Sequence, residues 1–140
     1  QRRSGCDLVS YLTPRLFTHL GIKRPTWETD PLGNSFGAGG LFLTLSELHK
    51  FGLFYLNKGK WNGKRILSEK WIEESTRASD TDDYGYLFWR GEQNSYRADG
   101  KYSQITMVLP EKNAVVSLVA ECRRGDELMR ALYDLVCAKL

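Results

Sequence analysis

Hydrophobic and polar positions near the start of the chain recur at helical spacing. Between Leu8 and Leu20, leucine and valine residues return every three or four positions, which is typical of an amphipathic helix. Asp7 is a candidate N-cap, and Gly21 is placed to end the helix. Because Pro14 cannot lie inside a helix without a kink, we expect two short helical pieces that meet there.

A second helical pattern follows a stretch rich in glycine and proline. The breakers between residues 23 and 40 predict a long irregular loop. Residues 41–58 then resume helical spacing, with a capping-box pattern at Thr44–Glu47 and Gly59 in position for a left-handed C-terminal cap. Hydrophobic residues surround this helix on most sides, so we expect it to be buried.

Residues after the second helix predict a hairpin, a short helix and then a sheet. Asn62-Gly63 favours a tight β-hairpin, and Ser68 predicts the start of a helix that ends near Arg77. From Tyr84 onward the hydrophobic period shortens to two, which is typical of strands. The expected strands are residues 86–89, 96–98, 105–109 and 114–120, with an antiparallel hairpin between the last two.

A final helix completes the pattern and sets the fold class. Asp126 is its expected N-cap, and one face carries Leu128, Leu132, Leu135 and Val136. Helices followed by antiparallel strands and a helix packed on the sheet predict an α+β fold. We expect residues 1–140 to form one domain, with a mostly helical region over 1–78 and the strands and last helix over 79–140.

Composition excludes several classes of protein. The chain is 41% hydrophobic and 26% charged, unlike disordered or low-complexity proteins. Twenty Lys and Arg against 17 Asp and Glu give a net charge of +3, too small for a nucleic-acid-binding surface. No apolar run reaches the roughly 18–20 residues of a membrane span. Three cysteines without C-x-x-C spacing argue against a disulfide framework or structural zinc, and lean weakly towards a cytoplasmic compartment.

Two motifs suggest chemistry that the rest of the sequence does not support. Gly33–Gly37 reads G-x-S-x-G, but the histidine that follows Ser35 is His49, and Glu47 is the only acid between them. Asp80–Gly85 resembles the start of a calcium loop but lacks the later ligands. We interpret both as loop segments and expect no metal and no cofactor.

Five stretches, taken in order, resemble one protein family. They are residues 16–22 (LFTHLGI), 39–52 (GGLFLTLSELHKFG), 61–68 (WNGKRILS), 85–89 (GYLFW) and 102–116 (YSQITMVLPEKNAVV). Together they are similar to the C-terminal half of the serine β-lactamase and penicillin-binding-protein superfamily, in its class C and esterase-like branch. The resemblance implies part of a β-lactamase/transpeptidase-like fold, whose sheet has five antiparallel strands, the first two of them outside this chain.

The catalytic motifs of that family are incomplete here. They are S-x-x-K with the nucleophilic serine, Y-x-N or Y-x-S, and K-T-G or a variant. No serine of the chain is followed three residues later by lysine. Tyr55-Leu56-Asn57 spells Y-x-N inside the expected buried helix, and we interpret it as chance. The resemblance implies that both motifs lie upstream of Gln1, which is not a methionine. We therefore expect no catalytic residue in this chain and no acyl transfer by it alone.

The third motif falls within the chain and supplies the candidate site. It aligns with Ala98-Asp99-Gly100, where Ala98 replaces the usual cation or histidine and Asp99 replaces threonine or serine. Gly100 is kept, and the residue after it donates a backbone N–H to the oxyanion hole in this family. The resemblance therefore implies a substrate-binding and oxyanion wall made of Ala98, Asp99, Gly100, Lys101 and Ser103. Without the cation, an ester or small amide is as plausible a substrate as a β-lactam or peptide.

The resemblance also implies partners. The full-length protein would take a small acyl substrate, and the missing N-terminal half would cover an unpaired strand edge and part of an apolar face. We expect that half, bound non-covalently, or self-association to stabilise the chain. One alternative is a non-catalytic binding module on the same scaffold, and another is an unrelated α+β domain that shares these motifs by coincidence. Members of the family are often exported, so the compartment stays open.

Overall fold

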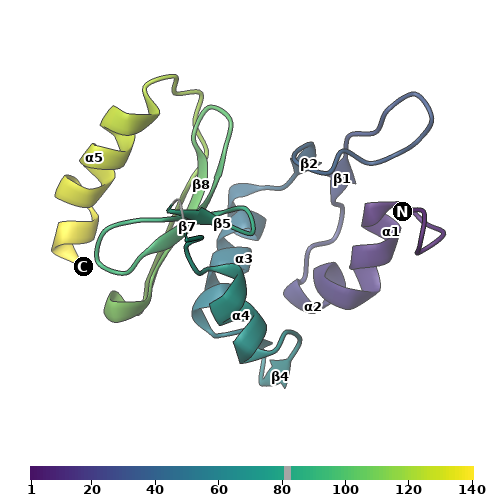
Figure 1. Cartoon of the computed structure of the whole chain (residues 1–140), viewed down its shortest axis with the longest axis horizontal. Helices are drawn as coiled ribbons and strands as arrows, with labels where there is room; N and C mark the ends of the chain where they lie inside the picture. The colour runs from purple at the N-terminus through teal and green to yellow at the C-terminus, as the bar shows by residue number, and fades with distance from the viewer. Residues whose placement is uncertain (81–82) are drawn as a thin grey trace.

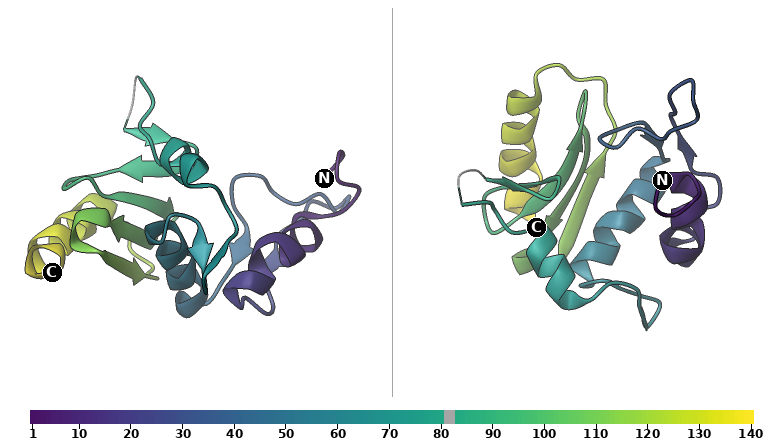
Figure 2. Two further views of the ribbon diagram at one scale, coloured as in Figure 1. Left: turned by 90° about the horizontal axis from the view of Figure 1, so that it is seen from below. Right: turned by 45° about the vertical axis from the view of Figure 1, so that its right-hand side comes forward.

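A five-stranded antiparallel sheet lies at the centre of the computed structural model, which describes residues 1–80 and 83–140. Its strands follow chain order: β5 (Tyr84–Gly85), β6 (Phe88–Arg90), β7 (Tyr96–Gly100), β8 (Gln104–Leu109) and β9 (Ala114–Leu118). Helix α3 (Leu45–Leu56) covers one face and α5 (Gly125–Leu135) the other (Figure 1 and Figure 2). This arrangement confirms the expected α+β fold with the last helix on the sheet.

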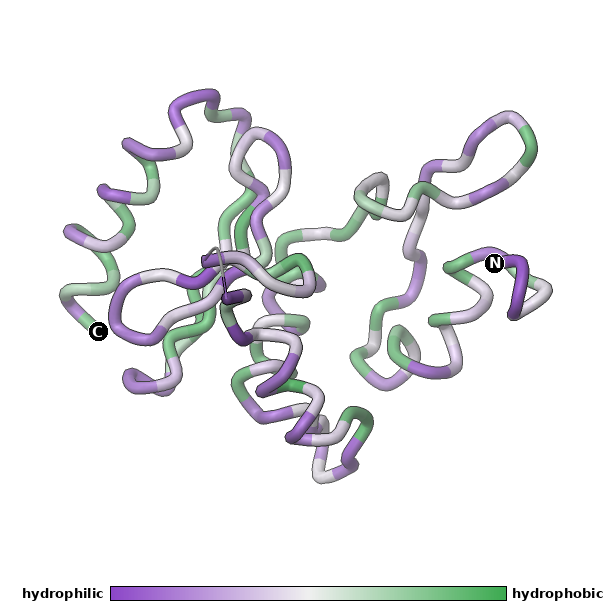
Figure 3. Tube along the Cα trace, in the orientation of Figure 1, coloured by the Kyte–Doolittle hydropathy of each residue, from purple (hydrophilic) through white to green (hydrophobic). Residues whose placement is uncertain are grey.

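Strand β8 is buried on both faces and divides the core into two clusters. Ile105, Met107 and Leu109 point towards α5, whereas Thr106 and Val108 point towards α3, and all five are at most 1% exposed. Side chains alternate between the two faces of a strand, so a strand covered on both sides is mostly apolar, and the buried Thr106 hydroxyl is hydrogen-bonded to Ser117. Figure 3 shows β8 as mostly hydrophobic, while hydrophobic and hydrophilic positions alternate along α5.

The N-terminal segment is one nearly continuous helical stretch. It comprises α1 (Leu8–Leu12), the π-helical turn η1 (Thr13–Phe17) and α2 (Thr18–Leu20). Asp7 caps its start by accepting the backbone N–H of Ser10 at 2.9 Å, and Gly21 ends it with a φ of 65°. The α-helix is interrupted at Pro14 as expected, but the two pieces are joined by a π-helical turn, so the stretch stays helical. A wider π turn accommodates the proline, which has no N–H for an i→i−4 bond.

The loop before α3 contains more structure than the sequence predicted. β1 (Thr26–Trp27) pairs with β2 (Leu41–Phe42), so the helix begins at Leu45 and not at residue 41. The capping box is confirmed, because Thr44 Oγ1 accepts the N–H of Glu47 at 3.3 Å and the Glu47 carboxylate accepts the N–H of Thr44 at 3.0 Å. Gly59 follows the helix with a left-handed φ of 79°.

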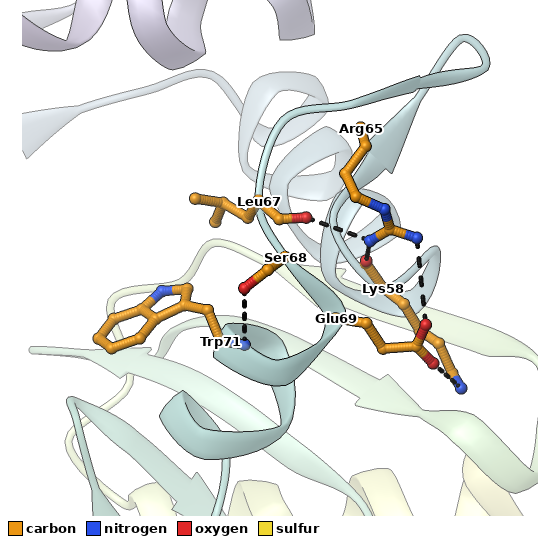
Figure 4. Close-up of polar contacts among 6 residues, drawn as sticks. All are labelled: Lys58, Arg65, Leu67, Ser68, Glu69 and Trp71. Atoms are coloured by element: carbon orange, nitrogen blue, oxygen red, sulfur yellow. Dashed lines mark hydrogen bonds and ion pairs between the residues drawn. The ribbon is translucent and has the colours of Figure 1, made fainter.

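A hairpin and a capped helix follow α3 as expected. β3 (Lys60–Trp61) and β4 (Lys64–Arg65) pair across Asn62 and Gly63, both of positive φ. α4 (Glu69–Ser75) starts where Ser68 Oγ accepts the N–H of Trp71 at 3.1 Å, and it ends two residues before Arg77 (Figure 4). Lys58 and Arg65 link the hairpin to Glu69, with 2.5 Å between Lys58 Nζ and Glu69 Oε1.

Two expectations in the second half of the chain were wrong. Tyr86 and Leu87 are not in a strand; they form the exposed turn between β5 and β6, with φ values of 46° and 71°. The sheet therefore reaches five strands within this chain. Helix α5 begins at Gly125 after Arg124, without the side-chain cap expected of Asp126.

The end of α5 also departs from the predicted face. Leu135 is 62% exposed and Val136 is 39% exposed, because the helix ends at Leu135 and the chain leaves helical register there. The buried face is completed by Met129, Leu132 and Tyr133, and by Cys137 in the short turn η3 (Cys137–Lys139). A similar turn, η2 (Pro110–Lys112), joins β8 to β9.

Candidate functional site

The tight turn between β7 and β8 carries the residues of the predicted third motif. Gly100 at the end of β7 pairs with Gln104 at the start of β8. The Ser103 N–H donates to the Gly100 carbonyl at 3.1 Å and closes the turn. Tyr102 and Ser103 both have left-handed backbones, with φ values of 63° and 71°. Two consecutive non-glycine residues in this region store backbone strain, which the surrounding structure must hold.

The segment after β9 holds this turn in place. The Cys122 N–H donates to the Tyr102 carbonyl at 3.1 Å, and the Ser103 hydroxyl donates to the Cys122 carbonyl at 3.4 Å. The Gln104 side-chain amide donates to the carbonyl of Ala120. Hydrogen bonds from three successive residues of one hairpin thus fasten it to a neighbouring strand end, which makes the turn a rigid platform.

The structure brings three of the five predicted site residues into one depression. Asp99, Gly100 and Ser103 line a shallow cavity of about 290 Å³ at the turn. Ala98 is on the opposite face of β7 from Asp99, where it packs against the core beneath α3. Lys101 is exposed at the tip of the turn and outside the cavity lining. Strand alternation explains the separation of Ala98 and Asp99.

Charges around the depression are unevenly distributed. The Asp99 carboxylate accepts a hydrogen bond from Arg97 Nε at 3.0 Å, so a cation on the same strand face already neutralises it. Two further cations approach the Tyr102 ring, with Lys101 Nζ 4.9 Å and Arg123 Cζ 5.7 Å from its centroid. The rim therefore carries positive charge beside an aromatic surface.

Sequence reasoning missed four residues that form this depression. Tyr102, Cys122 and Arg123 line it together with Gly125. Tyr102 lies within a matched segment but carries no motif of its own. Cys122 and Arg123 lie beyond β9, and no local pattern relates them to residues some twenty positions earlier.

The backbone of Lys101 is the feature of this turn with the most direct chemical use. Among the described residues, its N–H donates no main-chain hydrogen bond. A fixed and unpaired main-chain N–H can stabilise the negative charge that develops on a carbonyl oxygen during acyl transfer. This contribution does not depend on the side chain, so neither Ala98 nor Asp99 would remove it.

The other serine and histidine residues considered above are in structural contacts. Ser35 lies in the loop between β1 and β2, where its hydroxyl accepts the N–H of Leu8 at 3.3 Å. His49 Nδ1 instead lies 3.0 Å from the hydroxyl of Ser117 in β9. The Tyr55 hydroxyl bonds to Ser75 within the core. The G-x-S-x-G and Y-x-N patterns thus do not form catalytic groups.

Metal sites receive no support from the described residues. Within residues 1–80 and 83–140, no three His, Cys, Asp or Glu side chains gather in a way that could hold a metal ion. The calcium-like stretch Asp80–Gly85 includes positions 81 and 82, which lie outside the described residues, so that interpretation stays a prediction.

Comparison with known proteins places this site in a familiar fold. No protein-family model matches the sequence, and no curated protein matches it. A solved structure does match: "Putative 6-aminohexanoate-dimer hydrolase from Bacillus anthracis", with a TM-score of 0.80 and 20% sequence identity. The match covers 93% of this chain. The chain shares the fold of that solved structure, a β-lactamase-like fold.

The chain corresponds to only part of the protein whose fold it shares. It spans 38% of the length of that hydrolase chain. At 20% identity the likeness extends to the fold and not to particular residues, so the roles of Ala98 to Ser103 stay predictions. For the helices that the structure describes, none has the length and apolar character needed to cross a lipid bilayer.

Proposed function

We propose that this chain forms the oxyanion wall of a serine acyl hydrolase whose nucleophile and general base come from a segment outside this sequence. The observation that carries the proposal is the unpaired backbone N–H of Lys101, on a turn fastened by hydrogen bonds to the segment after β9. The likeness to a hydrolase fold supports it. In the reaction, a serine would attack the carbonyl carbon of an ester or amide, the N–H would stabilise the oxyanion, and water would release the acyl group.

Each of the five predicted site residues has a separate role in this proposal. Gly100 lets the backbone approach a bound acyl group, and Lys101 donates its N–H. Ser103 holds the turn through its bonds to Gly100 and Cys122. Asp99 would line the edge of the site as a neutralised pair with Arg97. Ala98 packs against the core beneath α3, so it brings no charge to the site, in contrast to the cation or histidine that the resemblance implies at this position.

A backbone donor can be tested with two substitutions at one position. The chain is combined with the polypeptide encoded directly upstream of it, and hydrolysis of p-nitrophenyl butyrate and nitrocefin is measured. Lys101→Pro removes the N–H and should lower kcat about 10²–10³-fold. Lys101→Ala keeps the N–H and should change kcat only a few-fold. Equal losses in both variants, with thermal unfolding unchanged, would show that the side chain matters and refute the assignment.

The same experiment tests the expected partner. Strand β9 pairs only with β8 among the described strands, so its other edge is open to a further strand. The chain alone should hydrolyse neither substrate and should self-associate or bind the upstream segment in light-scattering measurements. Turnover by the purified chain alone, or a stable monomer at high dilution that ignores the upstream segment, would contradict the proposal.

A non-catalytic binding module is the second candidate, and Asp99 favours it. Its carboxylate is engaged with Arg97 where catalytic relatives present a hydroxyl. The sequence encoded upstream of this chain distinguishes the two candidate functions. A hydrolase requires the S-x-x-K and Y-x-N motifs in that sequence, whereas a binding module does not.

A further inference from the structure

A second and larger cavity lies at the opposite end of β7 from the candidate site. It measures about 480 Å³ and is bordered by residues of α3, α4 and the β6–β7 hairpin. Its lining includes Tyr55, Ile72, Thr76, Arg90, Asn94 and Tyr96. Tyr96 begins β7 and Gly100 ends it, so the two cavities are about 13 Å apart along the strand. A volume of this size is typical of a site for a small molecule.

Two buried tyrosines form part of this cavity, and only one has a satisfied hydroxyl. Tyr55 and Tyr96 are each 6% exposed. The Tyr55 hydroxyl bonds to Ser75, whereas the Tyr96 hydroxyl has no hydrogen-bond partner within the described part of the chain. Every side-chain polar atom sealed from solvent in that part has a partner. The Tyr96 hydroxyl is therefore not sealed from solvent. Because Tyr96 lines this cavity, we infer that its hydroxyl faces the cavity. Burial raises the pKa of Tyr96 and keeps it a donor.

Arg90 brings a positive charge to the same place. Its Cζ lies 5.8 Å from the Tyr96 ring centroid. Its hydrogen bonds within the described part of the chain go to neutral acceptors, the carbonyl of Thr76 at 3.3 Å and two oxygens of Asn94. A guanidinium has five N–H donors, so Nε–H and one Nη1–H stay available.

The other charged residues of the lining already have counter-charges. Lys58 pairs with Glu69 at 2.5 Å, and Arg77 lies 3.4 Å from Glu74. Glu73 lies close enough to Lys58 for its charge to raise the lysine pKa. Arg90 is thus the lining cation, among the described residues, that is hydrogen-bonded only to neutral groups.

We propose that this cavity binds a small monocarboxylate with an apolar body, whose carboxylate accepts hydrogen bonds from Arg90 and Tyr96. The body of the ligand lies against Ile72 and the tyrosine rings. A carboxylate can accept a charge-assisted hydrogen bond from one free N–H of the guanidinium through one oxygen and a hydrogen bond from the Tyr96 hydroxyl through the other. Binding of this ligand does not depend on the acyl hydrolase proposed above.

The test compares three molecules of one shape and different charge. Isothermal titration calorimetry is run on the 140-residue chain with 3-phenylpropionate, 3-phenylpropanamide and 3-phenylpropylamine. The acid should bind at least about tenfold more tightly than the neutral amide, as expected for a hydrogen bond to a charged group. The amine should bind most weakly, because it meets an unpaired cation.

Two variants then assign the binding to this cavity. Tyr96→Phe removes only the hydroxyl and should weaken binding of the acid about tenfold. Tyr84→Phe removes a hydroxyl from β5, outside the cavity lining, and should leave binding unchanged. Substitution of Arg90 is avoided, because Arg90 also bonds to Thr76 and Asn94 and its loss would perturb folding.

Several results would overturn the proposal. They are equal affinity for acid and amide, tighter binding of the amine, no binding of the acid at about 1 mM, and unchanged affinity in a folded Tyr96→Phe variant. None of these results depends on ester hydrolysis. The carboxylate-binding proposal can therefore fail while the acyl hydrolase assignment stands, and the hydrolase assignment can fail while the carboxylate-binding proposal stands.

Discussion

Gly52 lies where α3 crosses the sheet, and a methyl group at this position would meet side chains of two strands. A Cβ there would lie 2.5 Å from Oγ1 of Thr106 in β8 and 2.6 Å from Cγ1 of Val115 in β9. Both distances are far inside van der Waals contact, and Thr106 is only 1% exposed, so it cannot turn into solvent. Gly52→Ala must therefore push α3 away from the sheet or displace both strand side chains.

Two opposing effects set the size of the change in stability. Alanine favours a helix over glycine by about 1 kcal/mol. Extra atoms in a filled core cost about 1–3 kcal/mol, and two simultaneous contacts place this site at the upper end. Displacement of Thr106 also disturbs its 2.8 Å hydrogen bond to Ser117, which contacts His49. We expect Gly52→Ala to lower the free energy of unfolding by about 1–2 kcal/mol.

Urea denaturation followed by tryptophan fluorescence measures this change. Gly125→Ala is the matched control, because an added Cβ at the start of α5 has no atom within 4 Å and should change stability by less than about 0.5 kcal/mol. If Gly52→Ala is as stable as the parent chain, then α3 does not pack this closely on β8 and β9, and the packing argument is wrong.

Two further predictions concern the core tyrosines and the start of α4. Burial raises the pKa of Tyr55 and of Tyr96 above the ordinary 10.0, so their contribution to stability is intact below pH 10 and is lost as the pH rises from there through the folded-state values. An ultraviolet titration should show that two of the seven tyrosines ionise only as the chain unfolds; ionisation of all seven near pH 10 with circular dichroism unchanged would contradict this. Ser68→Ala removes the cap of α4 and should lower the free energy of unfolding by about 1 kcal/mol, whereas Ser46→Ala at an exposed position of α3 should have a smaller effect; equal effects would argue against the cap.

Local chemistry explains which elements the sequence predicted correctly. The capping box of Thr44 and Glu47 and the turn at Asn62-Gly63 each depend on residues a few positions apart, so they can be read without the fold. The pairing of β1 with β2 could not be predicted in this way. Each strand has only two residues, and their partner lies beyond a loop rich in glycine.

The candidate site likewise contains residues that the sequence could locate and residues that it could not. The order of matched segments located Ala98, Asp99 and Gly100 on a strand, and the structure agrees with that placement. Arg123 and Cys122 reach the site only because β9 runs back along β8 and carries the following segment past the turn.

The sequence by itself determined the α+β class, most helix starts and the β8–β9 hairpin. These features depend on hydrophobic period and capping chemistry, which are encoded over a few residues. Only the tertiary structure decided that Arg97 neutralises Asp99 and that the segment after β9 is hydrogen-bonded to the β7–β8 turn. It also decided that Tyr96 and Arg90 line a common cavity. Contacts of this kind depend on sheet register and on the closeness of α3 and α4 to the sheet, and register is a property of the packed chain.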